Sequence, residues 1–337
     1  MQTMIPNRRV SQRGQMVAML AVGATALIGT GGFVLDMGVA YQAHRRAQAA
    51  ADASALGAAQ LLPTSPSAAQ TASAELTSSN LSEGTVTLTI STTYVANDTA
   101  TATATKSTSA FLSKVLGKSS FTEQATSTAV AGSYTGWSDG LSPWVIDKQS
   151  IEWGQLDEFK VKPGDQASSG NFGGARLPMR EKDCGLASGG NDYRNLISGS
   201  RTACMTNVGD KLNPETGNLT GPTNQGVNDR GFIQNFDPYS ILKQQADGSY
   251  VLTTYHHPNL IVIPVIDKFH QGNSSPFTVV GFAWFIITSY TNNTVTGMFI
   301  GSEVPGAAKC SNGSSSSTTC PFGGYDPYLF KVIQLQS

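Results

Sequence analysis

The feature that most constrains this chain is a run of 20 uncharged, mostly apolar residues from Met16 to Leu35. A helix of that length is roughly 30 Å long, which matches the hydrocarbon core of a bilayer. Three arginines precede the run, and two more follow it beyond Asp36. The positive-inside rule favours a cytoplasmic N-terminus with the rest of the chain translocated. We therefore expect a cytoplasmic leader at residues 1–15 and a single membrane-spanning helix after it.

A cleaved signal peptide is the alternative interpretation of this run. The apolar core of a signal peptide is about 7–15 residues long, and this run is longer. Residues 38–40 (Gly-Val-Ala) are only a fair cleavage site, and the residues after the Arg8-Arg9 pair do not complete a twin-arginine signal. The length of the run favours an anchor that is retained.

The helix is expected to continue out of the membrane. Residues 36–62 contain no Pro and consist largely of Ala, Leu, Gln and Arg, which are strong helix formers. Pro63 follows and should end the helix at Leu62. Residues 16–62 are therefore predicted to form one continuous rod, whose small Ala side chains suit close packing against neighbouring helices.

Charge is scarce and unevenly placed along the chain. Residues 1–46 carry five Arg and one Asp, a net charge of +4, whereas the remaining residues carry 17 basic and 22 acidic side chains, a net charge of −5. The total of −1 argues against a nucleic-acid partner, whose binding surface should be basic. Charged residues make up 13% of the chain, against about 25% in typical soluble proteins. A surface built from Ser, Thr, Asn and Gly indicates an extracytoplasmic body.

The segment after the rod is rich in Ser and Thr, with 22 of them in residues 64–109. Thr alternates with apolar residues over 85–91 and with Ala over 98–105, and this period of two predicts half-buried strands. The other expected elements are a helix at 67–80, a turn at 95–98, a short amphipathic helix at 110–117 and a strand at about 121–131. Together they predict a small α+β domain over residues 63–135.

Composition changes at residues 136–140, and the part that follows holds all four Trp and all four Cys. Its apolar runs are short and rich in β-branched and aromatic residues, which is typical of buried strands. They lie at 144–146, 260–266 and 277–287. The last run has 11 residues and is too short to span a bilayer. Gly, Asn and Pro at 216–223 predict tight turns. We expect a mainly-β domain over residues 136–337, so the fold class of the whole chain is α+β.

The four cysteines are spaced in two pairs, because Cys184 and Cys204 are 20 residues apart and Cys310 and Cys320 are 10 apart. An even number of cysteines beyond a membrane indicates disulfides. Pairing of neighbours would close two loops, and the connectivity stays open. Metal binding is the alternative, but the chain has no Cys-x-x-Cys motif and no His near these cysteines.

The remaining reactive residues form no familiar constellation. His256 and His257, with Asp267 and His270, do not have the spacing of a known metal site, and adjacent residues of a strand point to opposite faces. The sequence contains no Gly-x-Ser-x-Gly, P-loop or dinucleotide-binding motif. We therefore expect no catalytic residues, no metal site and no cofactor, and hence no enzyme.

The N-terminal residues resemble a known family. An Arg-Gly-Gln start, an Asp at the end of the apolar span and an Ala-Asp-Ala-Ser-Ala-Leu segment further along the helix occur together. The residues that carry the pattern are Arg13, Gly14, Gln15, Asp36, Tyr41, Arg45, Gln48 and Asp52. Over about residues 11–62 the chain resembles the N-terminal module of TadE/TadG-like proteins, which belong to the Flp (tight adherence) pilus-assembly system.

The resemblance implies a single-pass protein of the inner or cytoplasmic membrane. Its periplasmic or extracellular body would take part in assembling or anchoring a surface filament. Prepilins are cut after a Gly that is followed five residues later by Glu, whereas Met19 stands at that offset from Gly14. This departure favours an uncleaved, TadG-like anchor with a pilin-like helix.

The resemblance also implies partners for the N-terminal helix. These are the lipid bilayer and other Tad or pilus subunits that pack against the helix. Asp36 would either pair with a basic residue of a neighbouring subunit or mark the membrane surface as a solvated charge. The alternative function is a surface adhesin or ligand-binding protein that uses the same anchor and whose partner is a surface ligand.

Overall fold

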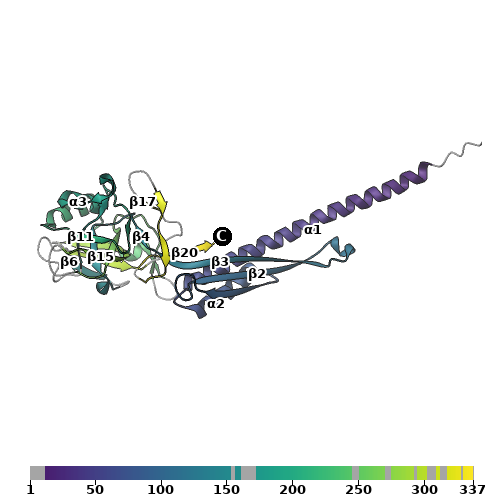
Figure 1. Ribbon diagram of the computed structural model, residues 1–337, viewed down its shortest axis with the longest axis horizontal. Coiled ribbons are helices and arrows are strands. Elements are labelled where there is room, and N and C mark those ends of the chain that lie inside the picture. The colour runs from purple at the N-terminus through teal and green to yellow at the C-terminus, as the bar shows by residue number, and fades with distance from the viewer. Residues whose placement is uncertain are drawn as a thin grey trace, which may run out of the picture. The chain divides into compact units, whose positions relative to one another are not determined.

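The computed structural model describes residues 12–152, 156–160, 172–244, 250–269, 275–291, 294–301, 309–311, 317–327 and 329–336 (Figure 1). The chain divides into two compact units. The first unit consists of Met1–Ser91, Ala100–Ala129 and Leu335–Ser337, and the second consists of Thr92–Thr99 and Val130–Gln334.

The first unit combines two helices with three strands. Its elements are α1 (Gln12–Leu61), α2 (Pro66–Asn80), β1 (Gly84–Ser91), most of β2 (Thr99–Ser109), the 3₁₀ helix η1 (Ser113–Leu116) and the first part of β3 (Ser120–Tyr134). α1 is one unbroken helix of 50 residues that ends just before Pro63, so the predicted continuous rod is confirmed. Pro63 stops it because proline cannot supply the backbone N–H that the next helical turn needs.

β1, β2 and β3 lie side by side in that order. Hydroxyl groups pair between β2 and β3, with 3.0 Å between Thr101 and Thr128 and 3.1 Å between Thr103 and Thr126. The intervening Ala residues of β2 are buried. The alternation of Thr with Ala therefore forms a sheet with one polar face and one packed face, as its period of two predicted.

The predicted amphipathic helix at 110–117 is wrong. The segment forms only the four-residue η1 at the tip of the β2–β3 hairpin. Gly117 ends it with φ of +85° and donates its N–H to the carbonyl of Lys114. At the start of this turn, the backbone N–H groups of Phe111 and Ser113 bind a carboxylate of α1.

The second unit is mainly β, as predicted. Its strands are the second part of β3, then β4 (Gly136–Trp137), β5 (Trp144–Asp147), β6 (Leu156–Lys160), β7 (Phe172–Arg176), β8 (Pro178–Met179), β9 (Gly185–Leu186), β10 (Thr206–Asn207), β11 (Lys211–Pro214), β12 (Leu242–Gln244), β13 (Tyr250–Leu252), β14 (Leu260–Ile266), β15 (Phe277–Thr291), β16 (Thr294–Ile300), β17 (Lys309–Ser311), β18 (Ser317–Thr319), β19 (Phe322–Gly324) and most of β20 (Lys331–Gln336). Its helices are α3 (Gly189–Ser198) and α4 (Thr220–Asp229), with 3₁₀ turns η2 (Lys148–Ser150), η3 (Arg180–Lys182) and η4 (Pro238–Ile241).

The main sheet has seven strands in the order β11-β7-β5-β14-β15-β16-β6. β11 also pairs with β15, so five of these strands close into a ring. The apolar run of β14 is buried along its whole length, because its side chains alternate between two hydrophobic clusters on opposite faces of the sheet. Burial on both faces explains why the predicted strands are continuous apolar runs.

Two helices of this unit were not expected from the sequence. α4 begins at Thr220, within the segment predicted to form tight turns. Gly217 does turn the chain, with φ of +116°, but Pro222 lies in the first turn of α4, where its missing N–H costs nothing. α3 and α4 pack together and place Tyr193 and Val227 in one of the two clusters.

The boundaries of the two observed units differ from the predicted domain boundaries. α1 shares its unit with α2 and the strands up to Ala129, because its second half packs within that unit. The loop Thr92–Thr99 belongs to the second unit.

Cys184 and Cys204, two of the four disulfide candidates, are bonded to each other, which settles the connectivity that the sequence left open for this pair. Cys320 is also disulfide-bonded. The side chain of Cys310 lies outside the described residues.

Candidate functional site

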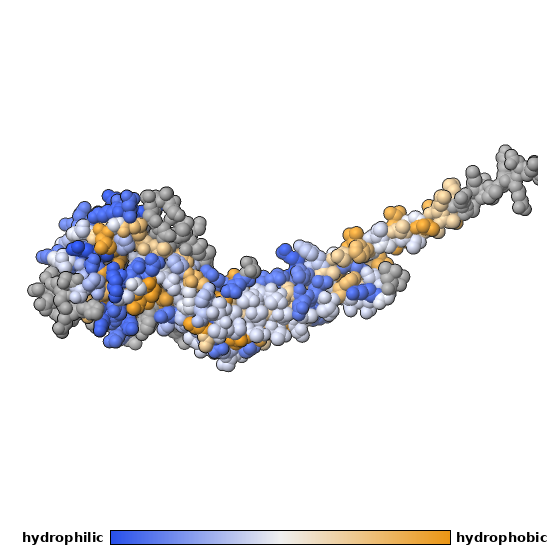
Figure 2. All heavy atoms as spheres, in the orientation of Figure 1, coloured by the Kyte–Doolittle hydropathy of each residue, from blue (hydrophilic) through white to orange (hydrophobic). Residues whose placement is uncertain are grey.

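The first half of α1 is apolar and unpacked. All residues from 16 to 31 are exposed, including Leu20 at 75% and Leu27 at 75% of their full surface. Figure 2 shows hydrophobic residues along this part of the helix. By length and composition it is the one helix of the described residues that could cross a membrane, and only 6% of its most apolar window is buried. A core helix of a soluble protein would instead be covered by its own chain.

The second half of α1 presents a narrow buried stripe. The buried residues recur every three or four positions, which places them on one helical face. They are Gly32, Asp36, Ala40, Ala43, Ala47, Ala50, Ala51, Ser54, Ala55, Ala58 and Ala59. Ala47, Ala50 and Ala51 pack against Leu81 and Ala104 of the same unit. The small side chains therefore bring the helix close to its own sheet.

Asp36 is the only ionisable residue of this stripe, and its exposed fraction is 1%. Its carboxylate accepts hydrogen bonds from the backbone N–H of Phe111 at 2.6 Å and of Ser113 at 2.6 Å. The hydroxyl of Ser113 donates a third bond at 2.5 Å. The interpretation of Asp36 as a solvated surface charge is therefore wrong, and almost none of its surface is left for the cation of another subunit.

The tip of the β2–β3 hairpin rests on α1 around this carboxylate (Figure 1). Leu112 packs directly on the backbone at Gly32, where an added Cβ would lie 2.1 Å from its Cδ1 atom. Gly32 is thus required by close packing. The contact joins the last turn of the apolar span to a loop more than 70 residues later in the chain.

Four other residues of the family pattern lie outside the buried stripe, on another side of α1. Tyr41, Arg45, Gln48 and Asp52 follow the helical spacing of four, three and four, so they form one ridge. Tyr41 is 65% exposed and Arg45 is exposed, whereas Gln48 and Asp52 are half-buried. The Gln48 side chain donates to the Asp52 carboxylate at 2.7 Å. We call these four residues the α1 ridge.

Arg13, Gly14 and Gln15 lie in the first turn of α1. Their side chains are outside the described residues. The ridge and Asp36 are therefore the parts of the pattern whose surroundings the structure defines.

The second unit contains a cavity of about 430 Å³. Its lining includes Arg201, Arg230, Tyr255, His256 and Trp284. The guanidinium of Arg230 is occupied by the carbonyls of Ile197, Pro258 and Leu260, and burial lowers its pKa. The buried indole N–H of Trp284 has no hydrogen-bond acceptor among the described residues.

His257 also lines this cavity. Its Nδ1 accepts the backbone N–H of Asn259 at 3.1 Å, which requires an unprotonated nitrogen, and burial lowers the pKa of the imidazole. Within the described residues no three His, Cys, Asp or Glu side chains cluster as metal ligands. His270 lies outside those residues.

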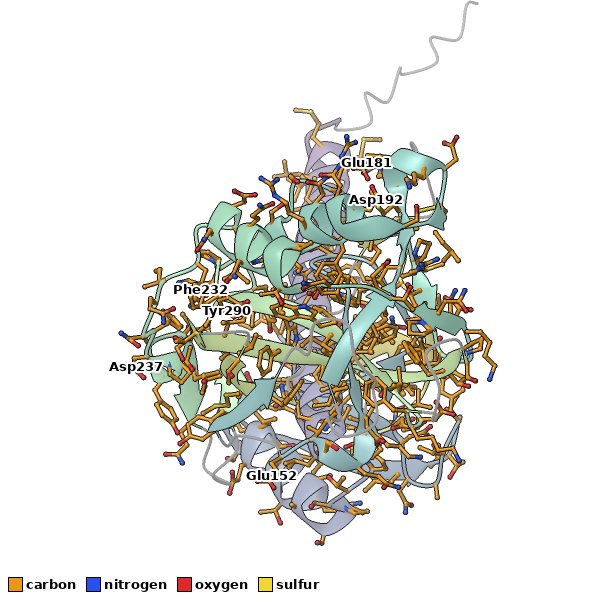
Figure 3. All side chains as sticks on the ribbon, turned by 90° about the vertical axis from the view of Figure 1, so that its left-hand side faces the viewer. Glu152, Glu181, Asp192, Phe232, Asp237 and Tyr290 are labelled. Atoms are coloured by element: carbon orange, nitrogen blue, oxygen red, sulfur yellow. A yellow bond between two sulfur atoms is a disulfide. The ribbon has the colours of Figure 1, made fainter. Side chains whose placement is uncertain are left out.

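Polar contacts in the rest of the second unit hold its loops and helices together. Asp192 of α3, labelled in Figure 3, accepts bonds from Lys182 at 2.5 Å and from the backbone of Ser188 at 2.9 Å. In the core, Trp144 donates to the hydroxyl of Tyr193 at 2.7 Å, and burial raises the pKa of that phenol. These are contacts of a folded scaffold, with each group bound to a structural partner.

Sequence reasoning missed the hairpin tip as a partner of Asp36. Phe111, Leu112 and Ser113 stand 75 or more residues after it in the chain. The only local signal was the pair of flanking strands, whose hairpin must carry its tip back along α1. The position along α1 that the tip reaches depends on the lengths of the two strands. The sequence predicts the ends of these strands only to within several residues.

Comparison with known proteins identifies the N-terminal part of the chain. Residues 14–61 match the Tad family model, described as "Putative Flp pilus-assembly TadE/G-like". This match confirms the resemblance found in the sequence, and it covers α1 almost completely. No curated protein and no solved structure matches the chain. α1 therefore matches the Tad family model, and the second unit is characterised by its structure alone.

Proposed function

We propose that the protein is a non-enzymatic, membrane-anchored component of a Flp/Tad-type system that assembles or anchors pili. The observation that carries this proposal is the Tad match over α1, together with the exposed apolar surface of the first half of that helix. α1 spans the membrane with residues 1–15 in the cytoplasm. The body lies on the extracytoplasmic side, where disulfides such as Cys184–Cys204 persist.

The α1 ridge is the proposed contact for other subunits. The buried stripe of α1 is already covered by its own unit, so another helix can approach only the exposed side. On that side Tyr41 and Arg45 present an aromatic ring and a guanidinium, both common in protein interfaces. Small neighbours such as the exposed Ala49 allow a second helix to come close.

Membrane anchoring is tested by fractionation. Cells that express the full chain are lysed, and membranes are washed with alkaline carbonate before the protein is located with an antibody. We expect the intact chain in the washed membranes. A soluble protein that begins near Tyr41 would contradict the anchor and support signal cleavage.

The role in assembly is tested by complementation. Cells lacking the gene receive the full chain, a chain without residues 140–337, or the Tyr41→Ala/Arg45→Ala double variant. Gln42→Ala/Arg46→Ala is the matched control, because both residues are exposed beside the ridge. We expect the ridge variant and the truncation to lose pili and the control to keep them.

The adhesin alternative predicts a different outcome. Its supporting observation is the cavity of the second unit, where the indole N–H of Trp284 has no acceptor among the described residues. Normal pili with lost surface attachment in the truncated chain would favour adhesion over assembly.

A further inference from the structure

We propose that the tip of the β2–β3 hairpin, residues 110–118, is a second membrane contact that binds anionic phospholipid headgroups beside α1. This inference rests on the proposed anchoring of α1 in the membrane. It assigns a partner to a surface that the family match at residues 14–61 does not include.

The depth of the tip follows from its contacts with α1. The 20 uncharged residues up to Leu35 are just long enough to cross the hydrocarbon core, so that core must extend to about Leu35. Leu112 packs on Gly32, three residues earlier in the helix. At 1.5 Å per residue, this contact lies roughly 5 Å inside the end of the span. The interfacial zone of each leaflet is roughly 5–7 Å thick and begins outside this boundary, so Leu112 reaches the outer edge of the hydrocarbon and the rest of the tip lies in the interfacial zone.

The backbone of the tip is suited to this environment. A loop that reaches the edge of the hydrocarbon must satisfy its own N–H and C=O groups, because the hydrocarbon contains no water to bind them. The N–H groups of Phe111 and Ser113 are bound by Asp36. Those of Gly117 and Lys118 bind carbonyls within the loop at 3.0 Å each. Asp36 itself is shielded, so the charge at the end of the span does not face lipid.

The exposed side chains of the tip match a lipid surface. Phe111 is a large apolar residue and is 71% exposed, whereas the next residue, Leu112, is partly buried. Lys114 and Lys118 are exposed, and residues 107–122 contain no acidic side chain. The ammonium of Lys118 lies 5.5 Å from the ring centre of Phe121. An aromatic ring beside cations is the combination found where proteins contact headgroups.

A second contact would fix the orientation of the first unit. A single helix can tilt and rotate in a bilayer, whereas a helix with a tip bound beside it cannot rotate freely. The α1 ridge would then face a defined direction in the plane of the membrane. This gives the hairpin a role in presenting the ridge to other subunits.

The test measures the depth of a nitroxide label on the full chain in vesicles. Phe111→Cys carries the label at the tip, Ile28→Cys marks the apolar span, and Ser67→Cys marks the start of α2. Position 67 is exposed and follows the end of α1, roughly 40 Å along the helix from Asp36. Accessibility to oxygen is compared with accessibility to a water-soluble nickel complex. The vesicles contain phosphatidylcholine with or without phosphatidylglycerol.

We expect the label at 28 in the hydrocarbon, the label at 111 at the interface and the label at 67 in water. Lys114→Ser and Lys118→Ser should each lower the ratio of bound to free tip roughly fivefold in vesicles with phosphatidylglycerol, and much less without it. A label at 111 as water-exposed as that at 67, while 28 lies in lipid, would overturn the tip contact and leave the anchor intact. A water-exposed label at 28 would overturn both proposals.

Discussion

The two halves of α1 differ in charge and in their surroundings. Both contain Ala and no Pro, but residues 16–35 are uncharged, whereas the second half carries Asp36, two Arg and Asp52. Every residue from 16 to 31 is exposed, whereas from Gly32 to Ala59 a buried residue recurs every three or four positions. The boundary between the exposed half and the half with buried residues lies where the hairpin tip contacts the helix. Neighbouring elements, rather than the helix sequence alone, therefore decide which half of α1 is a scaffold for the fold and which half is left for other contacts.

The largest effect is expected from filling the buried stripe. Ala50→Leu should lower the free energy of unfolding by about 1–3 kcal/mol, because overpacking forces the neighbouring side chains and backbone to move. Ala50 is fully buried beside Ala47 and Leu81. The measurement is urea unfolding of the full chain in detergent micelles.

Ala49→Leu is the matched control for that substitution, since Ala49 is the exposed neighbour of Ala50. It should change the free energy of unfolding by no more than about 0.5 kcal/mol. Equal losses in the two variants would contradict the division of α1 into a packed face and a free face.

A smaller effect is expected at Gly32, where the exposed half of α1 meets the half with the buried stripe. Gly32→Leu should displace Leu112 and accelerate hydrogen exchange at residues 110–118 roughly tenfold, because the loop can move to relieve overpacking. Gly29→Leu is the control, since nothing lies within 4 Å of a Cβ at that position. Unchanged exchange in Gly32→Leu would show that the tip does not rest on the helix.

Removing the charge of Asp36 should have a more local effect. Asp36→Asn keeps the size of the side chain but replaces charge-assisted hydrogen bonds by neutral ones, which are roughly half as strong. Exchange of the Phe111 and Ser113 amides should rise roughly fivefold. Asp52→Asn, which alters a half-buried carboxylate held by Gln48, should leave these amides unchanged. Faster exchange of these amides in Asp52→Asn but not in Asp36→Asn would show that Asp36 does not hold the tip.

The smallest effect is expected at the loop before β2, where Asp98 binds three backbone N–H groups, those of Thr93, Tyr94 and Val95. Burial raises the pKa of Asp98, but these hydrogen bonds outweigh it and hold the pKa below 3.8. The stabilisation is therefore present above pH 3.8 and is lost as the pH falls through the lower, folded-state pKa. The melting temperature should fall more steeply between pH 7 and pH 3 in the wild type than in Asp98→Asn. Equal dependence of the melting temperature on pH in the two proteins would contradict this role of Asp98.

Local patterns predicted much of the fold. The unbroken α1, the strands with Thr at every second position and the buried apolar strands follow from helix propensity and from periods of two. The even number of cysteines indicated disulfides, but it left their connectivity open. Patterns among residues that are close together in the sequence were therefore enough to predict the fold class.

Features that depend on long-range contacts were not predictable in this way. The tip at 110–117 has the pattern of a helix but forms one 3₁₀ turn, and a residue of α1 binds two N–H groups at its start. The Ala residues of α1 suited packing against any helix, and their partners are the strands and α2 of the same unit. Likewise, Asp36 looked like a charge at a membrane surface because its burial depends on a hairpin that follows much later.

A labelling scan along α1, in the full chain reconstituted in lipid vesicles, tests the division of this helix into a membrane half and a packed half. Nitroxide labels at successive positions from 16 to 60 report accessibility to oxygen and to a water-soluble relaxation agent. We expect uniform contact with lipid up to about residue 31, and then a period of 3.6 residues with protected positions at Asp36, Ala40, Ala43 and Ala47. Water contact throughout the first half, or no period in the second, would contradict this division.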